Sequence, residues 1–460
     1  MARHFRLEDR EQSLLFPPSV EDYLPEDHPA RFVWDLVNRL HDEGKLEVFY
    51  GQYNPEGRGG AAYHPRTMLA VLLHAYSRGI TSSRRISREC VENLAFHYLA
   101  ANQRPDHRAI AAFRKRHLVA FRALFQEVLK LCDAAGLVEL GRVAIDGRRV
   151  QGNASKDKTV TGETIDEKIA ALSEELLENA ERVDAAEDKE FGEARGDELP
   201  AGFRSKQERL ERLKQAREVL NERERKIRDE HAAKLEARKR FEDETGEKKR
   251  GPEPKAPDPS KTKKKHPPKA NTTDPDSRLM KTRDGFKQGY NGQIAADEKA
   301  GVIVASDVTQ DCVDTRQLAP TLDQIEANLG RLPDEALADA GYWSPENADL
   351  QEQRGIDLYI ATKKDSRQRT AGKRQSAPKG RIPRSASSRD RMERKLLTKR
   401  GQNAYRMRGP TVEGPFGLMV TRGLSRFMLR GLEAVRAEWH LWCTIHNVEK
   451  LRRTGKVSFS

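Results

Sequence analysis

The chain has 460 residues, of which 36% are hydrophobic, and a formal net charge of +12. This length allows two or three domains with hydrophobic cores, and the positive charge favours a polyanionic partner, nucleic acid before anionic membrane. The best apolar run, residues 68–76, is far shorter than the roughly 20 residues that span a bilayer, and the N-terminus lacks an apolar signal region. We therefore expect a cytoplasmic, nucleoid-associated protein without membrane contact.

The four cysteines lie far apart, and no two have C-x-x-C spacing: Cys90, Cys132, Cys312 and Cys443. This distribution is typical of reduced core cysteines. It favours neither a zinc site nor a disulfide framework.

The first 135 residues are predicted to form an all-helical domain. Residues 64–79 carry an apolar stripe, residues 81–103 have the pattern of two short helices, and residues 105–132 that of one long helix. Four basic residues near the start of the long helix are candidate DNA contacts: Arg108, Arg114, Lys115 and Arg116. The last two segments resemble a helix-turn-helix. A helical bundle with a basic rim is the alternative.

Residues 161–270 form a charged insertion. Apolar residues at helical spacing on either side of a break at 191–203 predict an antiparallel helical hairpin. Its expected seam consists of Ile169, Leu172, Leu176 and Val183 facing Leu210, Leu213, Leu220 and Ile227. Residues 248–269 are predicted to be a disordered basic linker. The dense alternating charges of the hairpin are most simply solvated helix faces.

Strand patterns flank this insertion. They cover residues 143–150, 286–297, 301–310, 335–339 and 356–362, with a helix expected over 315–330. This order predicts a mixed α/β sheet, in a domain built from residues 136–160 and 271–460.

Asp146 directly follows the apolar residues 143–145 of the first strand. A carboxylate at the edge of a core is costly unless a cation or hydrogen bonds offset its charge. Either Asp146 and Gly147 end the strand in a turn, or Asp146 is held there to bind a ligand.

Two further carboxylates have the same character. Asp339 closes the apolar strand "ALAD" and precedes two small residues, and Glu413 lies in an otherwise apolar stretch. Separately, each has an ordinary interpretation, as a turn residue or as a residue near a helix N-terminus. Together with Asp146 they form a candidate ligand set for hard divalent cations.

The stretches "AIDG", "DAGYWS" and "YRMRGPTVEGPFG" resemble the three acidic motifs of bacterial insertion-sequence transposases of the DDE type, in the insertion-sequence-four-like superfamily. The flanking stretches "HPRTMLAVLLHAYSRGITSSRRI" and "TDPDSRLMK" are similar to the same family. The similarity covers nearly the whole chain outside the charged insertion.

The resemblance implies a ribonuclease-H-like core in which Asp146, Asp339 and Glu413 hold two Mg²⁺ or Mn²⁺ ions. It also implies that Tyr405 and Arg408 contact DNA phosphate. The expected activity is metal-dependent cleavage and strand transfer at the terminal inverted repeats and at target DNA. The chain departs from the family where a lysine is usual seven residues after the glutamate, because Val420 stands there.

Residues 363–400 contain 15 basic and 3 acidic residues, a surplus equal to the net charge of the whole chain. A clamp that neutralises DNA phosphate is the favoured interpretation, and a solvated loop is the alternative. The candidate contacts are Lys373, Arg374, Lys379, Arg381 and Arg384.

An insertion sequence has two ends to cut, so a homodimer or higher oligomer on DNA is expected. The competing functions are an inactive DNA-binding derivative of a transposase and a coiled-coil scaffold.

Overall fold

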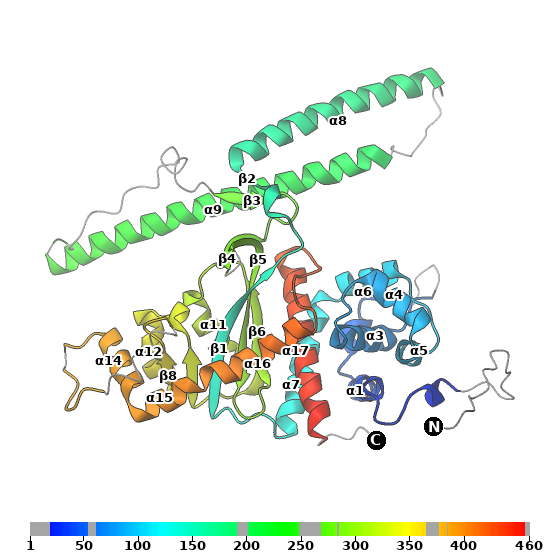
Figure 1. Ribbon diagram of the computed structural model, residues 1–460. Coiled ribbons are helices and arrows are strands. Elements are labelled where there is room, and N and C mark those ends of the chain that lie inside the picture. Colours follow the sequence, from blue (N-terminus) through cyan, green and yellow to red (C-terminus); the bar gives the residue numbers. More distant parts are fainter. Residues whose placement is uncertain are drawn as a thin grey trace, which may run out of the picture.

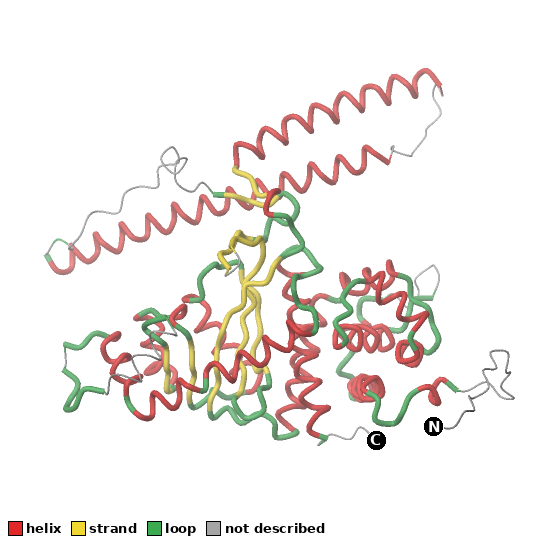
Figure 2. The backbone as a smooth tube through the Cα atoms, viewed as in Figure 1, coloured by secondary structure: helices red, strands yellow, loops and turns green. Residues whose placement is uncertain are grey.

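The computed structural model describes residues 19–53, 61–190, 201–246, 248, 268–282, 285–364, 377–383 and 385–455, with the backbone alone over 177–190 and 201–205. A cluster of N-terminal helices, a central sheet packed with helices and a long two-helix arm make up this part of the chain (Figure 1). Figure 2 shows the long strands together in the central sheet and two short strands at the base of the arm.

The central sheet mixes antiparallel and parallel strands. β1 lies in its middle, antiparallel to β5 on one side and parallel to β7 on the other. β8 extends the parallel side, and β4 and β6 pair with β5. The strands are β1 (Arg142–Gln151), β4 (Arg278–Thr282), β5 (Gly285–Asp297), β6 (Ile303–Thr309), β7 (Glu335–Ala338) and β8 (Asp357–Ile360). The predicted mixed α/β sheet is confirmed.

Helices cover both faces of this sheet, which explains why β5 is buried along most of its length. α16 packs on β1, and α17 packs on β6 and on α7. α11 contacts β6 and β5. The helices of this region are η3 (Thr315–Gln317), α11 (Leu318–Leu329), η4 (Ala340–Tyr342), α12 (Pro345–Arg354), α14 (Ser388–Leu397), α15 (Lys399–Arg406), α16 (Arg408–Thr421) and α17 (Leu432–Thr454).

The described part of the N-terminal region is helical, as predicted. Its helices are η1 (Val20–Tyr23), α1 (Pro29–Asp42), α2 (Glu47–Tyr50), α3 (Pro65–Ser77), α4 (Ser83–Glu92), α5 (Leu94–Leu99), α6 (His107–Arg116) and α7 (Leu118–Ala134). The single long helix expected over 105–132 is wrong, because the chain breaks at His117 (φ −105°, ψ 33°). The His117 ring is buried against Phe49 and Phe113. The break lets α6 pack on α4 while α7 packs along α17.

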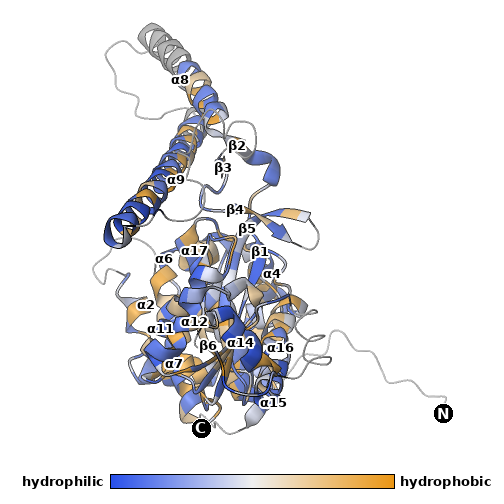
Figure 3. Cartoon of the chain, turned by 90° about the vertical axis from the view of Figure 1, so that its left-hand side faces the viewer, coloured by the Kyte–Doolittle hydropathy of each residue, from blue (hydrophilic) through white to orange (hydrophobic). Residues whose placement is uncertain are grey.

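The arm is an antiparallel hairpin, as predicted. α8 (Gly162–Glu190) packs on α9 (Ala201–Thr245), and two ion pairs, Arg217 with Asp166 and Lys206 with Glu175, show that the two helices run in opposite directions. β2 (Thr159–Thr161) and β3 (Lys269–Asn271) pair at its base. Figure 3 shows that α9 is largely hydrophilic along its length.

The seam of the arm is shorter than the sequence predicted. Leu172, Leu176 and Leu213 form one buried cluster, and Leu220 belongs to a second one with Ile165. Ile227 is 46% exposed and therefore does not belong to the seam. The Val183 side chain and most of the predicted linker lie outside the described residues.

A continuous hydrophobic core joins the N-terminal helices to the sheet. Cys132 of α7 and Asn447 of α17 are in contact there, and Arg331 pairs with Asp133 at the surface. Among the described residues, none of the helices combines the length and the apolar character that crossing a bilayer requires.

Candidate active site

Asp146 lies inside strand β1, which continues to Gln151. Gly147 pairs with Gln293 of β5 rather than forming a turn, so the turn interpretation is wrong. On the other side, Ile145 pairs with Ala338, the last residue of β7. Asp146 and Asp339 are the next residues on these two parallel neighbours, and the sheet therefore places the two carboxylates side by side.

The electrostatics confirm that the two acids are neighbours. Burial, together with the charge of Asp339, raises the pKa of Asp146 to about 6, and Arg408 acts in the opposite direction. Arg408 Nη1 of α16 lies 3.0 Å from Asp146 Oδ2, and the side chain of Arg408 is only 6% exposed. The other oxygen of Asp146 accepts a hydrogen bond from Gly147 N. Arg408 is thus the counter-ion of Asp146 in this structure.

Glu413, the third predicted acid, has an exposed side chain in α16. It lies five residues after Arg408, which puts the two side chains about 140° apart around the helix axis. Within the described residues, no three His, Cys, Asp or Glu side chains gather closely enough to hold a metal ion. The structure therefore brings together Asp146 and Asp339 and leaves Glu413 apart from them.

The Asp146–Asp339 pair by itself suits a hard divalent cation. Its donors are carboxylate oxygens, which such cations prefer. Burial and repulsion from Asp339 make the negative charge on Asp146 costly, as its raised pKa shows, and a bound cation relieves both effects. Asp146 and Asp339 together therefore suit a metal ion, whereas Glu413 does not join them in this structure.

Two family matches decide the class of the protein. Residues 18–116 match the family described as Transposase domain (DUF772), and residues 256–448 match the Transposase DDE domain. The chain belongs to the DDE transposases. Members of this family generally use divalent metal ions. No curated protein and no solved structure matches the transposase.

The sequence missed an acid near the Asp146–Asp339 pair, Asp314, which precedes η3. Its carboxylate accepts hydrogen bonds from Asn291 and Gln293 of β5. Its charge also acts on Tyr342, as do those of Asp146 and Asp339. No comparable signal was present in the sequence, because Asp314 lies five residues after the end of β6, whereas Asp339 directly follows β7.

The two residues predicted to contact phosphate beside the acids are buried. Tyr405 is 8% exposed, and the Arg408 guanidinium lies 5.9 Å from its ring centre. The position that departs from the family, Val420, is exposed on α16. The nearby Arg422 pairs with Glu449 of α17.

The other predicted DNA contacts fall into three groups. Arg108, Lys115, Arg116, Lys379 and Arg381 are exposed and accessible to a ligand. Arg114 is buried and donates hydrogen bonds to Tyr76, Thr81 and Ser83. It therefore joins α6 to α3 and to the start of α4 and is not on the surface. Lys373, Arg374 and Arg384 lie outside the described residues.

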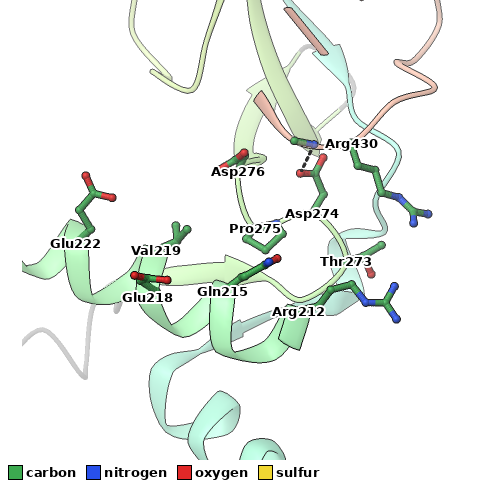
Figure 4. Close-up of a pocket in the computed structure, with 11 residues that line it drawn as sticks. Arg212, Gln215, Glu218, Val219, Glu222, Thr273, Asp274, Pro275, Asp276 and Arg430 are labelled. Carbon is green, nitrogen blue, oxygen red and sulfur yellow. Dashed lines mark hydrogen bonds between the residues drawn. The ribbon is translucent and has the colours of Figure 1, made fainter. Parts of the chain in front are cut away.

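A separate pocket of about 570 Å³ lies between α9 and the turn at 273–276. Figure 4 shows Arg212, Gln215, Glu218 and Glu222 of α9 on one side and Asp274, Asp276 and Arg430 on the other. Acidic and basic side chains both line it, and none of the predicted catalytic acids does. We assign it no ligand.

Proposed function

We propose that this transposase binds the ends of an insertion sequence and catalyses cleavage and strand transfer at DNA phosphodiester bonds. The observation that carries the proposal is the placement of Asp146 and Asp339 at adjacent positions of two parallel strands. The strand order, with β5, β1, β7 and β8 side by side and β6 beyond β5, supports a ribonuclease-H-like core.

Asp146 and Asp339 would hold Mg²⁺ or Mn²⁺, with Glu413 as the third ligand of a two-ion set. When bound, such ions lower the pKa of a nucleophilic hydroxyl and stabilise the leaving oxygen. In cleavage, a water oxygen forms a bond to phosphorus as the bond to the 3′-oxygen breaks. In transfer, the freed 3′-hydroxyl attacks a phosphorus of target DNA in the same way. One site therefore serves both steps.

The chain's own residues prepare this site. Asp146 is partly buried in the sheet, and Arg408 balances its charge in the absence of other cations. The β1–β7 pairing places the backbones of the two acids at adjacent positions of the sheet. If Arg408 leaves Asp146, its planar guanidinium becomes available for a phosphate.

DNA binding is assigned to the exposed basic residues at the start of α6, at its end and in the 363–400 segment. They act through phosphate neutralisation, so binding should weaken with salt by about 0.9 log unit per phosphate contact. An unchanged salt slope after Lys373, Arg374, Lys379, Arg381 and Arg384 are replaced by Ala would remove that segment from the DNA interface. We place the protein in the cytoplasm, on the nucleoid.

Charge-neutral variants of the acids test the proposed activity. Asp146→Asn, Asp339→Asn and Glu413→Gln should each reduce cleavage of donor DNA with Mg²⁺ by at least about 1,000-fold, because each removes a candidate metal ligand. DNA affinity, measured by gel shift, should stay within about threefold, since none of the three contacts phosphate. Glu352→Gln, an exposed acid of α12, is the matched control.

Each outcome has a definite meaning. A variant that cuts at the wild-type rate loses its assignment, which for Glu413 would leave the pair as the whole acidic site. A wild-type protein that binds terminal-repeat DNA without cutting it would replace the proposal by the inactive DNA-binding derivative.

A further inference from the structure

A buried polar network lies behind the acidic pair, on the other face of the sheet. Asp146 pairs with Ile294, whereas Gly147 pairs with Gln293 and Arg149 with Asn291. Side chains alternate between the two faces along a strand, so Gln293 and Asn291 point away from the face that carries Asp146.

Gly147 leaves the space that this network fills. A Cβ atom at Gly147 would lie 2.2 Å from Gln293 Nε2, 2.7 Å from Asp314 Oδ1 and 2.9 Å from Asn291 Oδ1. Real Cβ atoms do not approach other heavy atoms this closely, so a side chain at this position would push the ends of Gln293, Asp314 and Asn291 out of their present contacts. The Asp-Gly pair of the sequence thus reflects packing inside a strand.

Asp314 is the acceptor at the centre of the network. It is 8% exposed, and its Oδ1 accepts from Asn291 Nδ2 at 2.6 Å and from Gln293 Nε2 at 2.9 Å. Although Asp314 precedes η3, its side chain makes no capping hydrogen bond there. Its carboxylate is therefore directed at β5 rather than at its own helix.

The network continues from Asp314 to the turn that carries Asp339. An ionised carboxylate only accepts, so it fixes the amide of Gln293 with Nε2 toward Asp314 and Oε1 away from it. That Oε1 accepts a hydrogen bond from the Tyr342 hydroxyl. Burial and the charges of Asp314, Asp146 and Asp339 hold the pKa of Tyr342 well above its usual range, so the hydroxyl remains a donor.

A second contact connects the same two segments. Thr315, the residue after Asp314, donates to Gly341 O at 3.0 Å, and Gly341 N donates to Asp339 Oδ1 at 2.7 Å. Tyr342 is the third residue after Asp339 and is fully buried. The residues at 314–315 therefore hold both the backbone and the aromatic anchor of the 339–342 turn.

We propose that Asp314 is a positioning residue that sets the orientation of the Asp339 carboxylate, acting through Gln293 and Tyr342. The inference rests on the proposed function, which gives Asp339 its role. It adds a residue that lies outside the predicted acidic triad and that touches neither substrate nor metal.

The test compares Asp314→Ala, Tyr342→Phe and the double variant in the full-length protein. Two quantities are measured: kcat and KM for cleavage of donor DNA, and hydrogen–deuterium exchange over residues 339–343 without DNA or metal. Asp297→Ala is the matched control, because Asp297 is an equally buried acid at the far end of β5 that accepts from the backbone of Leu140 and Lys299.

Asp314→Ala should lower kcat about tenfold or more with KM nearly unchanged, since small misplacements of a catalytic group cost rate. It should also speed exchange over 339–343. Tyr342→Phe should act in the same direction, and the double variant should be no worse than Asp314→Ala, because both changes break one chain of contacts. Asp297→Ala should lose thermal stability while keeping kcat and the exchange rate of 339–343.

The proposal is overturned if the losses of kcat caused by the two single changes multiply in the double variant. It is also overturned if Asp314→Ala has the same kcat and the same exchange rate over 339–343 as the Asp297→Ala control. If Asp314→Ala does not fold, Tyr342→Phe tests the proposal alone. Unchanged kcat and unchanged exchange over 339–343 in Tyr342→Phe would then overturn the proposal. A wild-type protein that fails to cut DNA contradicts the proposed function. The exchange measurement then still tests whether Asp314 holds the 339–342 turn through Gln293 and Tyr342.

Discussion

At the scale of single residues, Arg408 occupies the place at Asp146 that a divalent cation would take in the proposed site. Its guanidinium lies 3.0 Å from Asp146 Oδ2, and a metal and an arginine cannot both neutralise the same oxygen at contact distance. Arg408→Gln should therefore tighten Mn²⁺ binding by about tenfold, a change of roughly 1.4 kcal/mol. Isothermal titration calorimetry without DNA at pH 8 measures it.

Arg422→Gln is the control for this prediction, because Arg422 caps the same helix but pairs with Glu449. Its Mn²⁺ affinity should equal that of the wild type. Equal or weaker binding by Arg408→Gln would show that the ion pair does not compete with the metal. If Asp146→Asn also left Mn²⁺ binding unchanged, the acidic pair would lose its assignment as a metal site.

The sequence could identify the acidic residues because of where they fall in apolar strands. Asp146 and Asp339 follow buried residues, and that pattern placed them correctly on neighbouring strands. Asp314 could not be assigned in this way. Its role depends on the gap at Gly147 and on two amides of β5, which only the folded sheet brings together. The same limit explains why Arg114 was predicted on the surface, since its burial comes from α3 and α4.

At the scale of elements, periodicity predicted the strands of the central sheet that carry the site, but not where one helical pattern becomes two helices. The α6–α7 break at His117 follows from tertiary packing, since residues 105–132 have a continuous helical pattern. β4 and the short β2–β3 pair were missed, because they are short and only partly buried, whereas the equally short β7 and β8 are almost fully buried. The prediction of secondary structure was therefore correct for extensively buried elements. It was wrong where packing against a neighbouring element determined the local structure.

One contact between elements gives a pH-dependent prediction. Glu438 of α17 is fully buried and accepts from the backbone N–H groups of Met428 and Leu429, which fastens the loop between α16 and α17. Burial raises the pKa of Glu438 from 4.5 to about 7, although hydrogen bonds from that loop act in the opposite direction. The folded protein therefore binds more protons than the unfolded chain between these two pH values.

The contribution of Glu438 to the free energy of unfolding is fully present below about pH 4.5 and is lost as pH rises through about 7. Its size is on the order of 3 kcal/mol. Glu438→Gln keeps an acceptor but cannot ionise, so its stability relative to wild type should rise across this window. Urea unfolding from pH 4.5 to 8 measures the difference. Glu433→Gln, an exposed acid of the same helix, is the control, and parallel profiles for Glu438→Gln and wild type would contradict the prediction.

At the scale of the whole molecule, the described side chains of the arm bury little apolar surface for its length. α9 has 45 residues and α8 has 29, yet the buried residues among those side chains form two small clusters. Beyond Leu220, the exposed Ile227 shows that the apolar stripe continues outside the hairpin. Such an arm gains stability from a partner, either its own catalytic core or a second protomer.

Removing the arm separates these two possibilities. Thr161 and Lys269 face each other at the end of the β2–β3 pair, so residues 162–268 can be replaced by an Asn-Gly turn that joins the two strands. An insertion sequence has two ends, and we expect at least two protomers to act on them. If the arm forms the interface between them, light scattering of the variant bound to single terminal-repeat duplexes should report monomers where the wild type forms dimers. Gel shifts should show that the variant still binds DNA, because the basic residues of α6 and of the 363–400 segment remain. A variant that still forms dimers would instead place the interface outside the arm.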